Sequence, residues 1–149
     1  MMHAFPRTFF PPQSRQARVT RAVVAPLPAA TYIRLRREAA GLSIEDVARR
    51  ICGHPRDLAT ATDLVRMLEQ PGNVARSNDT LDRLQAAFPF DPAVYRQLAT
   101  EPADRHPRVC VGCGCSQWDS DDAHTIPFAW AGPHACVRCT GEAGAETEQ

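Results

Sequence analysis

Residues 31–51 have the sequence TYIRLRREAAGLSIEDVARRI, whose apolar spacing predicts two helices joined by a tight turn. The first helix places Tyr32, Leu35 and Ala39 on one face. It ends at Gly41, because glycine readily adopts the left-handed conformation that closes helices. The chain is therefore expected to turn sharply here before a second helix begins.

The second helix is expected to begin at Ser43, because a serine hydroxyl accepts a hydrogen bond from the free N–H groups at a helix start. Asp46 lies three residues later and completes a near capping box, with aspartate in place of the usual glutamate. The apolar residues that follow at the spacing of one helix face are Ile44, Val47, Ala48 and Ile51. This pattern predicts a helix with one face against a core.

Three more helices are predicted before the cysteine-rich part of the chain begins. Their expected limits, set by prolines, glycine and capping residues, are residues 54–71, 77–89 and 91–102. Pro55 suits the first position of a helix, where its missing N–H has no partner to lose. The fold class is therefore expected to be mainly α.

These helices resemble the Cro/repressor-like, XRE-type helix-turn-helix DNA-binding domains. The residues that carry the resemblance are Arg34-Leu35-Arg36, Gly41-Leu42-Ser43, Glu45, Val47-Ala48 and the LVRMLE segment at residues 64–69. The resemblance implies a five-helix repressor-like helix-turn-helix domain over residues 31–101, whose third helix enters the major groove of double-stranded DNA. It also implies a homodimer, the usual form of this family on palindromic sites.

The candidate DNA contacts lie at the start of the second helix and in the segment that follows it. The connection between the second helix and the LVRMLE segment is longer than the family's by roughly one and a half to two turns, at about 3.6 residues per turn. The extra residues fall where DNA would be contacted. The expected contact residues are Ser43, Arg56, Thr60, Thr62 and Arg66.

Residues 1–30 contain five prolines and four arginines, and they show no sustained helical or strand period. We interpret them as an extended basic arm. Its Arg15, Arg18 and Arg21 would follow the phosphate backbone or enter the minor groove, and their contribution would fall steeply with salt. The alternative is a solvated tail whose phenylalanines pack on the core.

Charge is distributed unevenly along a chain whose formal net charge is zero. All seventeen basic residues are arginine, and residues 1–37 contain no acidic residue. Arginine binds phosphate and guanine through paired hydrogen bonds, so the basic front favours a nucleic-acid partner. The acidic last third favours a protein partner there, such as RNA polymerase, or a purely structural role.

Residues 109–141 contain two C-x-x-C pairs, Cys110 with Cys113 and Cys136 with Cys139. Each pair can bind a metal ion from a tight turn, and four thiolates are typical ligands of a structural Zn2+. About 40 residues with few large apolar side chains need such a metal to fold. The module resembles the zinc-ribbon class and, more loosely, the cysteine-rich tails of uncharacterised phage and prophage proteins.

Several alternatives to this ligand set stay open. Cys115 is a surplus thiol that can replace Cys113 or join a second metal. His124 and His134 are substitute ligands, and an iron–sulfur cluster would also use four thiolates. Cys52 lies beside the apolar stripe of the second helix, and we interpret it as a buried small apolar residue.

These patterns divide the chain into five parts. They are an extended basic arm (1–30), a helix-turn-helix domain (31–101), a linker (102–108), a four-cysteine zinc module (109–141) and a disordered acidic tail (142–149). The chain has no apolar run of membrane-spanning length and no signal-peptide core, so we expect a cytoplasmic protein without a membrane partner. It has no nucleophile–base pattern at believable spacing, so we expect no catalytic residues and no enzymatic activity.

Two functions agree with these features. The first is a sequence-specific DNA-binding transcriptional regulator whose zinc module supports dimerisation or contacts a partner. The second is a phage-type interaction or inhibitor protein that binds a host protein through its helical and zinc modules without contacting DNA. The basic front favours the first function. The lengthened connection before the reading helix and the excess of acids in the helical domain favour the second.

Overall fold

The computed structural model describes residues 25–119 and 129–141, and it is mainly helical, as the sequence predicts. Its elements in chain order are α1 (Ala29–Ala39), α2 (Ile44–Ile51), η1 (Pro55–Asp57), α3 (Leu58–Leu68), α4 (Asn78–Ala87), α5 (Pro92–Thr100), η2 (Ala103–Arg105), β1 (Trp130–Gly132), β2 (Ala135–Cys136) and α6 (Val137–Thr140). The features predicted for Arg15, Arg18, Arg21, His124 and the tail at residues 142–149 lie outside the described residues.

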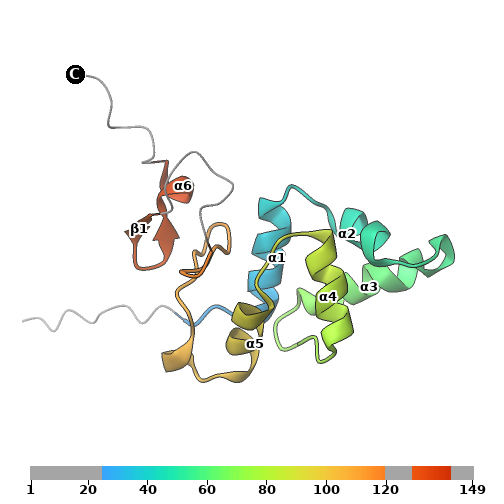
Figure 1. The fold of residues 1–149 in the computed structure, drawn as a ribbon, viewed down its shortest axis with the longest axis horizontal. Coiled ribbons are helices and arrows are strands. Elements are labelled where there is room, and N and C mark those ends of the chain that lie inside the picture. Colours follow the sequence, from blue (N-terminus) through green and yellow to red (C-terminus); the bar gives the residue numbers. More distant parts are fainter. Residues whose placement is uncertain (1–24, 120–128, 142–149) are drawn as a thin grey trace, which may run out of the picture.

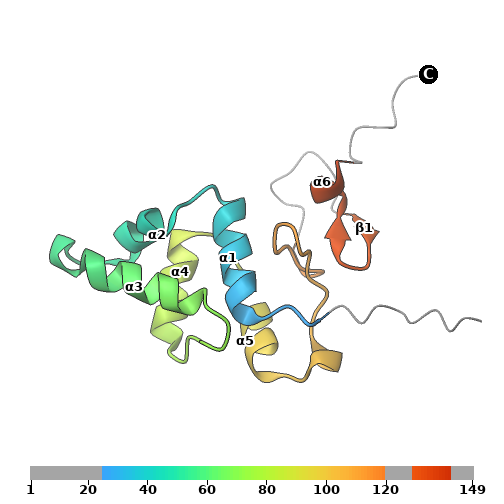
Figure 2. The same ribbon diagram turned by 180° about the vertical axis from the view of Figure 1, so that it is seen from behind.

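Helices α1 to α5 pack around one apolar core, and the two short strands and α6 lie at the other end of the molecule (Figure 1). Helix α2 contacts α3 and α4, and α1 contacts α5. The largest fully buried side chains of this core are Tyr32, Tyr95, Ile33, Leu68, Leu81, Leu84, Val47, Val65 and Val94. Helix α1 stands between the two ends, as the view from behind also shows (Figure 2).

Helix α1 buries a face that differs from the expected one. Tyr32 and Ile33 are fully buried, whereas Leu35 is half-buried and Ala39 is exposed. The buried face continues one turn later at Arg37, which a hydrophobic pattern cannot identify. The expected stripe therefore agrees with the structure at Tyr32 only, because a charged side chain occupies the next core-facing turn.

The turn after α1 and the start of α2 form as predicted. Gly41 has a φ of 70°, in the left-handed region that favours glycine. The Ser43 hydroxyl accepts a hydrogen bond from the Asp46 N–H at 3.1 Å, and the Asp46 carboxylate accepts one from the Ser43 N–H at 2.9 Å. This second bond holds the pKa of Asp46 below its usual value. The capping box is therefore complete and fixes where α2 begins.

Two segments differ from expectation in detail. The third helix forms in two pieces, because Pro55 opens the short 3-10 helix η1 and α3 starts only after it. The predicted linker at residues 102–108 contains η2, and Val109 directly after it belongs to the buried core of the helices. The chain between the two ends is thus anchored to the helical core.

An ion pair between Arg37 and Glu69 joins α1 to the end of α3. The Nε and Nη2 atoms of Arg37 donate hydrogen bonds to the two carboxylate oxygens of Glu69 at 2.5 and 2.8 Å. Nη1 of Arg37 donates to the Leu42 carbonyl at 2.8 Å. The two side chains are 9% and 7% exposed, and the bonds to Glu69 raise the pKa of Arg37. A buried charge that loses its partner is costly, so this pair holds α1, the turn and α3 together.

We expect the Arg37→Ala substitution to lower the free energy of unfolding by about 3–5 kcal/mol, because it leaves the Glu69 carboxylate buried without its partner. Urea unfolding followed by far-UV circular dichroism measures this loss. The matched control is Arg34→Ala, an exposed position on the same helix, which should change the free energy by less than about 0.5 kcal/mol. A loss below about 1 kcal/mol for Arg37→Ala would contradict the role given to the pair.

Candidate metal centre

The first cysteine turn is a tight loop closed by backbone hydrogen bonds. Val109 and Ser116 pair as an antiparallel bridge, and the Cys110 N–H donates to the Cys115 carbonyl at 2.8 Å. The Gly114 N–H donates back to the Cys110 carbonyl at 2.9 Å. Gly114 has a φ of 74°, which permits this reversal. The loop therefore directs the sulfurs of its cysteines into a small space.

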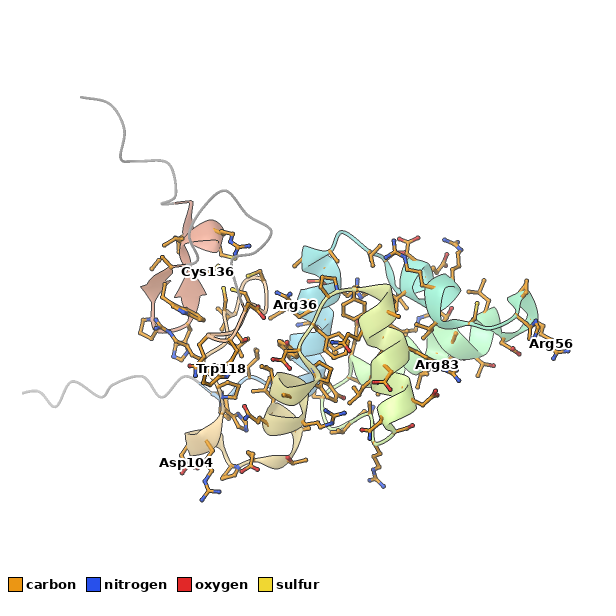
Figure 3. All side chains as sticks on the ribbon, viewed as in Figure 1. Arg36, Arg56, Arg83, Asp104, Trp118 and Cys136 are labelled. Carbon is orange, nitrogen blue, oxygen red and sulfur yellow. The ribbon has the colours of Figure 1, made fainter. Side chains whose placement is uncertain are left out.

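The second cysteine turn follows a two-stranded hairpin. Strands β1 and β2 pair antiparallel, and Cys136 ends β2 directly before the single turn of α6. The Val111 N–H donates to the His134 carbonyl at 2.9 Å, which ties the first cysteine turn to this hairpin. Figure 3 shows Cys136 at this end of the molecule.

Four thiols meet between these two turns. The Sγ atoms of Cys110, Cys113, Cys115 and Cys136 all lie within 4.8 Å of one another. The Cys113 sulfur is 3.2 Å from that of Cys115 and 3.7 Å from that of Cys136. A tetrahedral Zn2+ with Zn–S bonds of about 2.3 Å places its sulfurs about 3.8 Å apart. The cluster therefore has the size and ligand type of a closed metal site.

The predicted ligands Cys110, Cys113 and Cys136 are all in this cluster, and its fourth member is Cys115. The remaining predicted ligand, Cys139, is exposed and lies at the rim of the site, beside Gly112 of the first cysteine turn. Sequence spacing alone favours Cys139, because it completes a second C-x-x-C pair. The signal for Cys115 is its position two residues after Cys113 in a glycine-containing turn.

Backbone N–H groups point at the sulfur of Cys110. Those of Gly112 and Cys136 each lie 3.4 Å from it. Burial of the Cys110 thiol alone raises its pKa, but these N–H groups and that of Cys113 outweigh burial and lower it. The hydrogen bond between the Cys113 and Cys115 thiols is the main cause that lowers the pKa of Cys113 to about 4. The site thus stabilises thiolates, the form that binds metals.

Two thiols at this end of the molecule, Cys115 and Cys139, have a raised pKa. The pKa of Cys115 is raised, mainly by its hydrogen bond to Cys113 and by burial. The pKa of Cys139 is raised mainly by desolvation of its sulfur beside the cluster, although the residue as a whole is exposed. Metal binding would therefore release protons, because every ligand sulfur must become a thiolate. Cys52, at the end of α2, is half-buried, whereas the sequence predicts a buried residue. His134 is exposed and outside the sulfur cluster.

An arginine supports the hairpin next to the cluster. The guanidinium carbon of Arg108 lies 4.0 Å from the centre of the Trp130 ring, and its Nε donates to the Pro133 carbonyl at 3.0 Å. Its Nη2 also donates to the Gly132 carbonyl. These contacts join the segment before the first cysteine turn to the tip of the hairpin, so the two turns are held at a fixed spacing.

The first cysteine turn docks on α1. Arg36 lies 3.4 Å from the Asp119 carboxylate and donates from Nε to the Pro89 carbonyl at 3.1 Å. A side chain at Gly114 would lie 2.9 Å from Cδ of Arg36 and 3.2 Å from Cβ of Leu35. Figure 3 shows Arg36 reaching from α1 toward the cysteine end. This close approach explains why Leu35 is half-buried although it does not face the helical core.

The predicted DNA-contact residues differ in how they are placed. Arg56 is 82% exposed on η1, and Arg66 is 57% exposed and lies 3.4 Å from Asp63. Thr60 is exposed, whereas Thr62 is 9% exposed and donates its hydroxyl hydrogen bond to the Leu58 carbonyl at 2.8 Å. Ser43 uses its hydroxyl in the cap of α2. The structure thus leaves Arg56, Thr60 and Arg66 available to a ligand and turns Thr62 inward.

Comparison of the chain with protein-family models, with curated proteins and with solved structures finds no match. None of the described helices is long and apolar enough to span a membrane.

The Gly114→Ala substitution should weaken the docking of the cysteine turn. We expect a loss of about 2–4 kcal/mol in unfolding free energy, from left-handed strain and from the contact with Leu35. Urea unfolding followed by tryptophan fluorescence measures this loss, because both tryptophans, Trp118 and Trp130, lie beside the cysteine turns. Gly132→Ala, where an added Cβ meets nothing within 4 Å, is the control and should change little. Equal effects of the two substitutions would contradict the docking.

Proposed function

We propose that the chain is a sequence-specific double-stranded DNA-binding regulator whose helices form a helix-turn-helix domain and whose cysteine cluster holds a structural Zn2+. The observation that carries this proposal is the exposed surface of η1 and α3, at the end of the molecule far from the cysteines. Arg56 marks that end in Figure 3, and Cys136 marks the opposite end.

The placement of α3 supports a reading role. One face of the helix, with Val65 and Leu68, packs into the core against α2, and the other carries Thr60, Asp63 and Arg66 at the surface. The capped helix α2 precedes it, as in the helix-turn-helix arrangement in which the second helix reads base edges. The arginines at 56 and 66 can each donate paired hydrogen bonds to guanine or phosphate.

The chemistry of the cysteine cluster supports zinc. Its ligands are sulfur only, it is largely buried, and its spacing matches a tetrahedral ion, which are the features of a closed structural site. Four thiolates would leave no open position for a substrate. The metal would therefore stabilise the fold, and the complete site would carry net negative charge. This charge favours DNA contact at the opposite end.

A second candidate function is binding to a protein. The surface formed by Arg56, Arg66 and their neighbours also contains Glu45 and Asp63, and Met67 on the adjacent turn is 46% exposed. Acidic groups and an exposed apolar side chain are more typical of a protein interface than of a phosphate contact. The phage-type inhibitor hypothesis rests on this mixture, and the cysteine end would serve as a second contact.

Removing the metal should disturb the cysteine end and spare the helices. We expect the protein as purified to contain one zinc per chain, and a strong chelator to change the emission of Trp118 and Trp130. The far-UV circular dichroism of the helices should change little, because their core contains no cysteine. Readdition of zinc should restore the fluorescence. Iron with visible charge-transfer absorption in place of zinc would overturn the metal assignment.

DNA binding is tested by selection. The zinc-loaded full chain is incubated with a pool of random duplexes at two salt concentrations, and the retained DNA is sequenced. We expect enrichment of one short sequence. On it, Arg66→Ala and Arg56→Ala should each weaken binding about tenfold or more, the effect of losing one base or phosphate contact. The control is Arg105→Ala in η2, an exposed arginine paired with Glu101 near α5, which should bind as the unmodified chain does.

The outcome also separates the two candidate functions. Sequence-indifferent binding that disappears at moderate salt, unchanged by Arg66→Ala, would reject the regulator. A stoichiometric protein partner that survives nuclease treatment and is lost on Met67→Ala would then support the interaction protein.

A further inference from the structure

Five thiols gather where a tetrahedral metal needs four. Cys110, Cys113 and Cys136 interact with both of the remaining two, Cys115 and Cys139, within the cluster and at its rim. Cys115 is 4% exposed, whereas Cys139 is exposed. The three shared sulfurs thus have one possible fourth ligand on the buried side of the site and another that solvent reaches.

Cys139 is held at the site and is not a distant surface thiol. A side chain at Gly112 would lie 2.8 Å from the Cys139 sulfur and 3.1 Å from its Cβ. A Cβ at residue 112 would therefore crowd Cys139 and force its side chain to shift from this position beside the first cysteine turn. α6, a single turn that starts directly after Cys136, carries Cys139 back toward the shared sulfurs.

We propose that Cys115 and Cys139 are interchangeable fourth ligands of one metal ion, and that Cys139 is a site of oxidation by hydroperoxides when Cys115 holds the metal. The inference rests on the proposed metal site and adds a modification site to it. The shared thiolates bind in both arrangements. The exchange needs only one sulfur to leave as another enters, because Cys115 lies within 4.8 Å of the shared sulfurs and Cys139 lies directly beside the first cysteine turn.

The oxidation is balanced with peroxide as the oxidant. The Cys139 sulfur attacks the O–O bond, becomes a sulfenic acid, and hydrogen peroxide is reduced to water. The Cys113 thiolate then attacks the Cys139 sulfur, a disulfide forms, and hydroxide leaves. The two sulfurs together lose the two electrons that the peroxide gains. The metal keeps three thiolates in place of four and is held more weakly.

The first arm of the test measures zinc stoichiometry in single variants of the full chain. Cys115→Ser and Cys139→Ser should each still bind one zinc per chain, because the other thiol takes the fourth position. The Co2+-substituted forms of both should keep the charge-transfer intensity of four thiolates. The double variant Cys115→Ser/Cys139→Ser keeps only three thiols at the site and should lose this intensity, and Cys52→Ser, remote from the site, should match the unmodified chain.

The second arm adds hydrogen peroxide to the zinc-loaded proteins and follows zinc transfer to a chromogenic chelator. The unmodified chain and Cys52→Ser should release zinc and form a Cys113–Cys139 disulfide, which peptide mass spectrometry identifies. Cys139→Ser should release zinc roughly tenfold more slowly, because its sulfurs are all bound to metal. Cys115→Ser should be equally slow, since Cys139 is then a ligand.

Three results would overturn the proposal. Loss of zinc from either Cys115→Ser or Cys139→Ser alone would show that the ligand set is fixed, while the proposed metal site itself would stand. Zinc release from Cys139→Ser as fast as from the unmodified chain would place the reactive sulfur elsewhere. Failure of the unmodified chain to bind zinc would remove the metal site and this inference together.

Discussion

The ion pair between Arg37 and Glu69 is the constraint on which the arrangement of the helices depends. Two buried charges cannot be separated without leaving one unpaired in an apolar surrounding, so the start of the helical domain and the end of α3 must come together. The third hydrogen bond, to the Leu42 carbonyl, brings the turn before α2 into the same contact. Arg66 lies on the exposed surface of α3, three residues before Glu69. The orientation of this α3 surface relative to α1 is therefore set by Glu69, which is buried in the ion pair and is not one of the proposed DNA contacts.

The residue before Arg37 faces the other end of the molecule. Arg36 pairs with Asp119 and bonds to the Pro89 carbonyl, and the first cysteine turn packs against its side chain at Gly114. Adjacent residues on one helix point in different directions, so α1 can serve both ends at once. Asp119 in turn accepts a hydrogen bond from the Ser116 N–H, directly after the cysteine turn. A metal that ordered the first cysteine turn would thus also constrain α1, through the Arg36–Asp119 ion pair and through the packing of Gly114 against Arg36.

The features that sequence predicts well are those with local causes. The capping box of α2, the left-handed Gly41 and the mainly helical fold follow from residues next to one another in the chain. The burial of Arg37 depends on a partner 32 residues away, so no periodicity can predict it. Leu35 is covered by the docked cysteine turn and not by the core, a contact between segments far apart in sequence. The sequence likewise predicts Thr62 as a DNA contact. In the structure its hydroxyl donates a hydrogen bond to the Leu58 carbonyl of the same helix, and the side chain is buried.

The cysteine cluster likewise has features that local sequence spacing predicts and others that only the tertiary structure decides. Two C-x-x-C pairs identify a sulfur site and its approximate position, because each pair is a local turn. They do not decide between Cys115 and Cys139, since that choice depends on how the two turns meet. The structure places Cys115 on the side that faces α1 and buries it, and it leaves Cys139 on the solvent side. The buried residues of this end are mostly cysteines, so its core consists largely of candidate metal ligands. With the metal that we propose, a small module of this kind would gain its stability from that ion and from its docking on α1. Val109, buried in the helical core, and Gly114, packed against α1, anchor the first cysteine turn to the helices. The helices therefore help to hold the cysteine cluster in place.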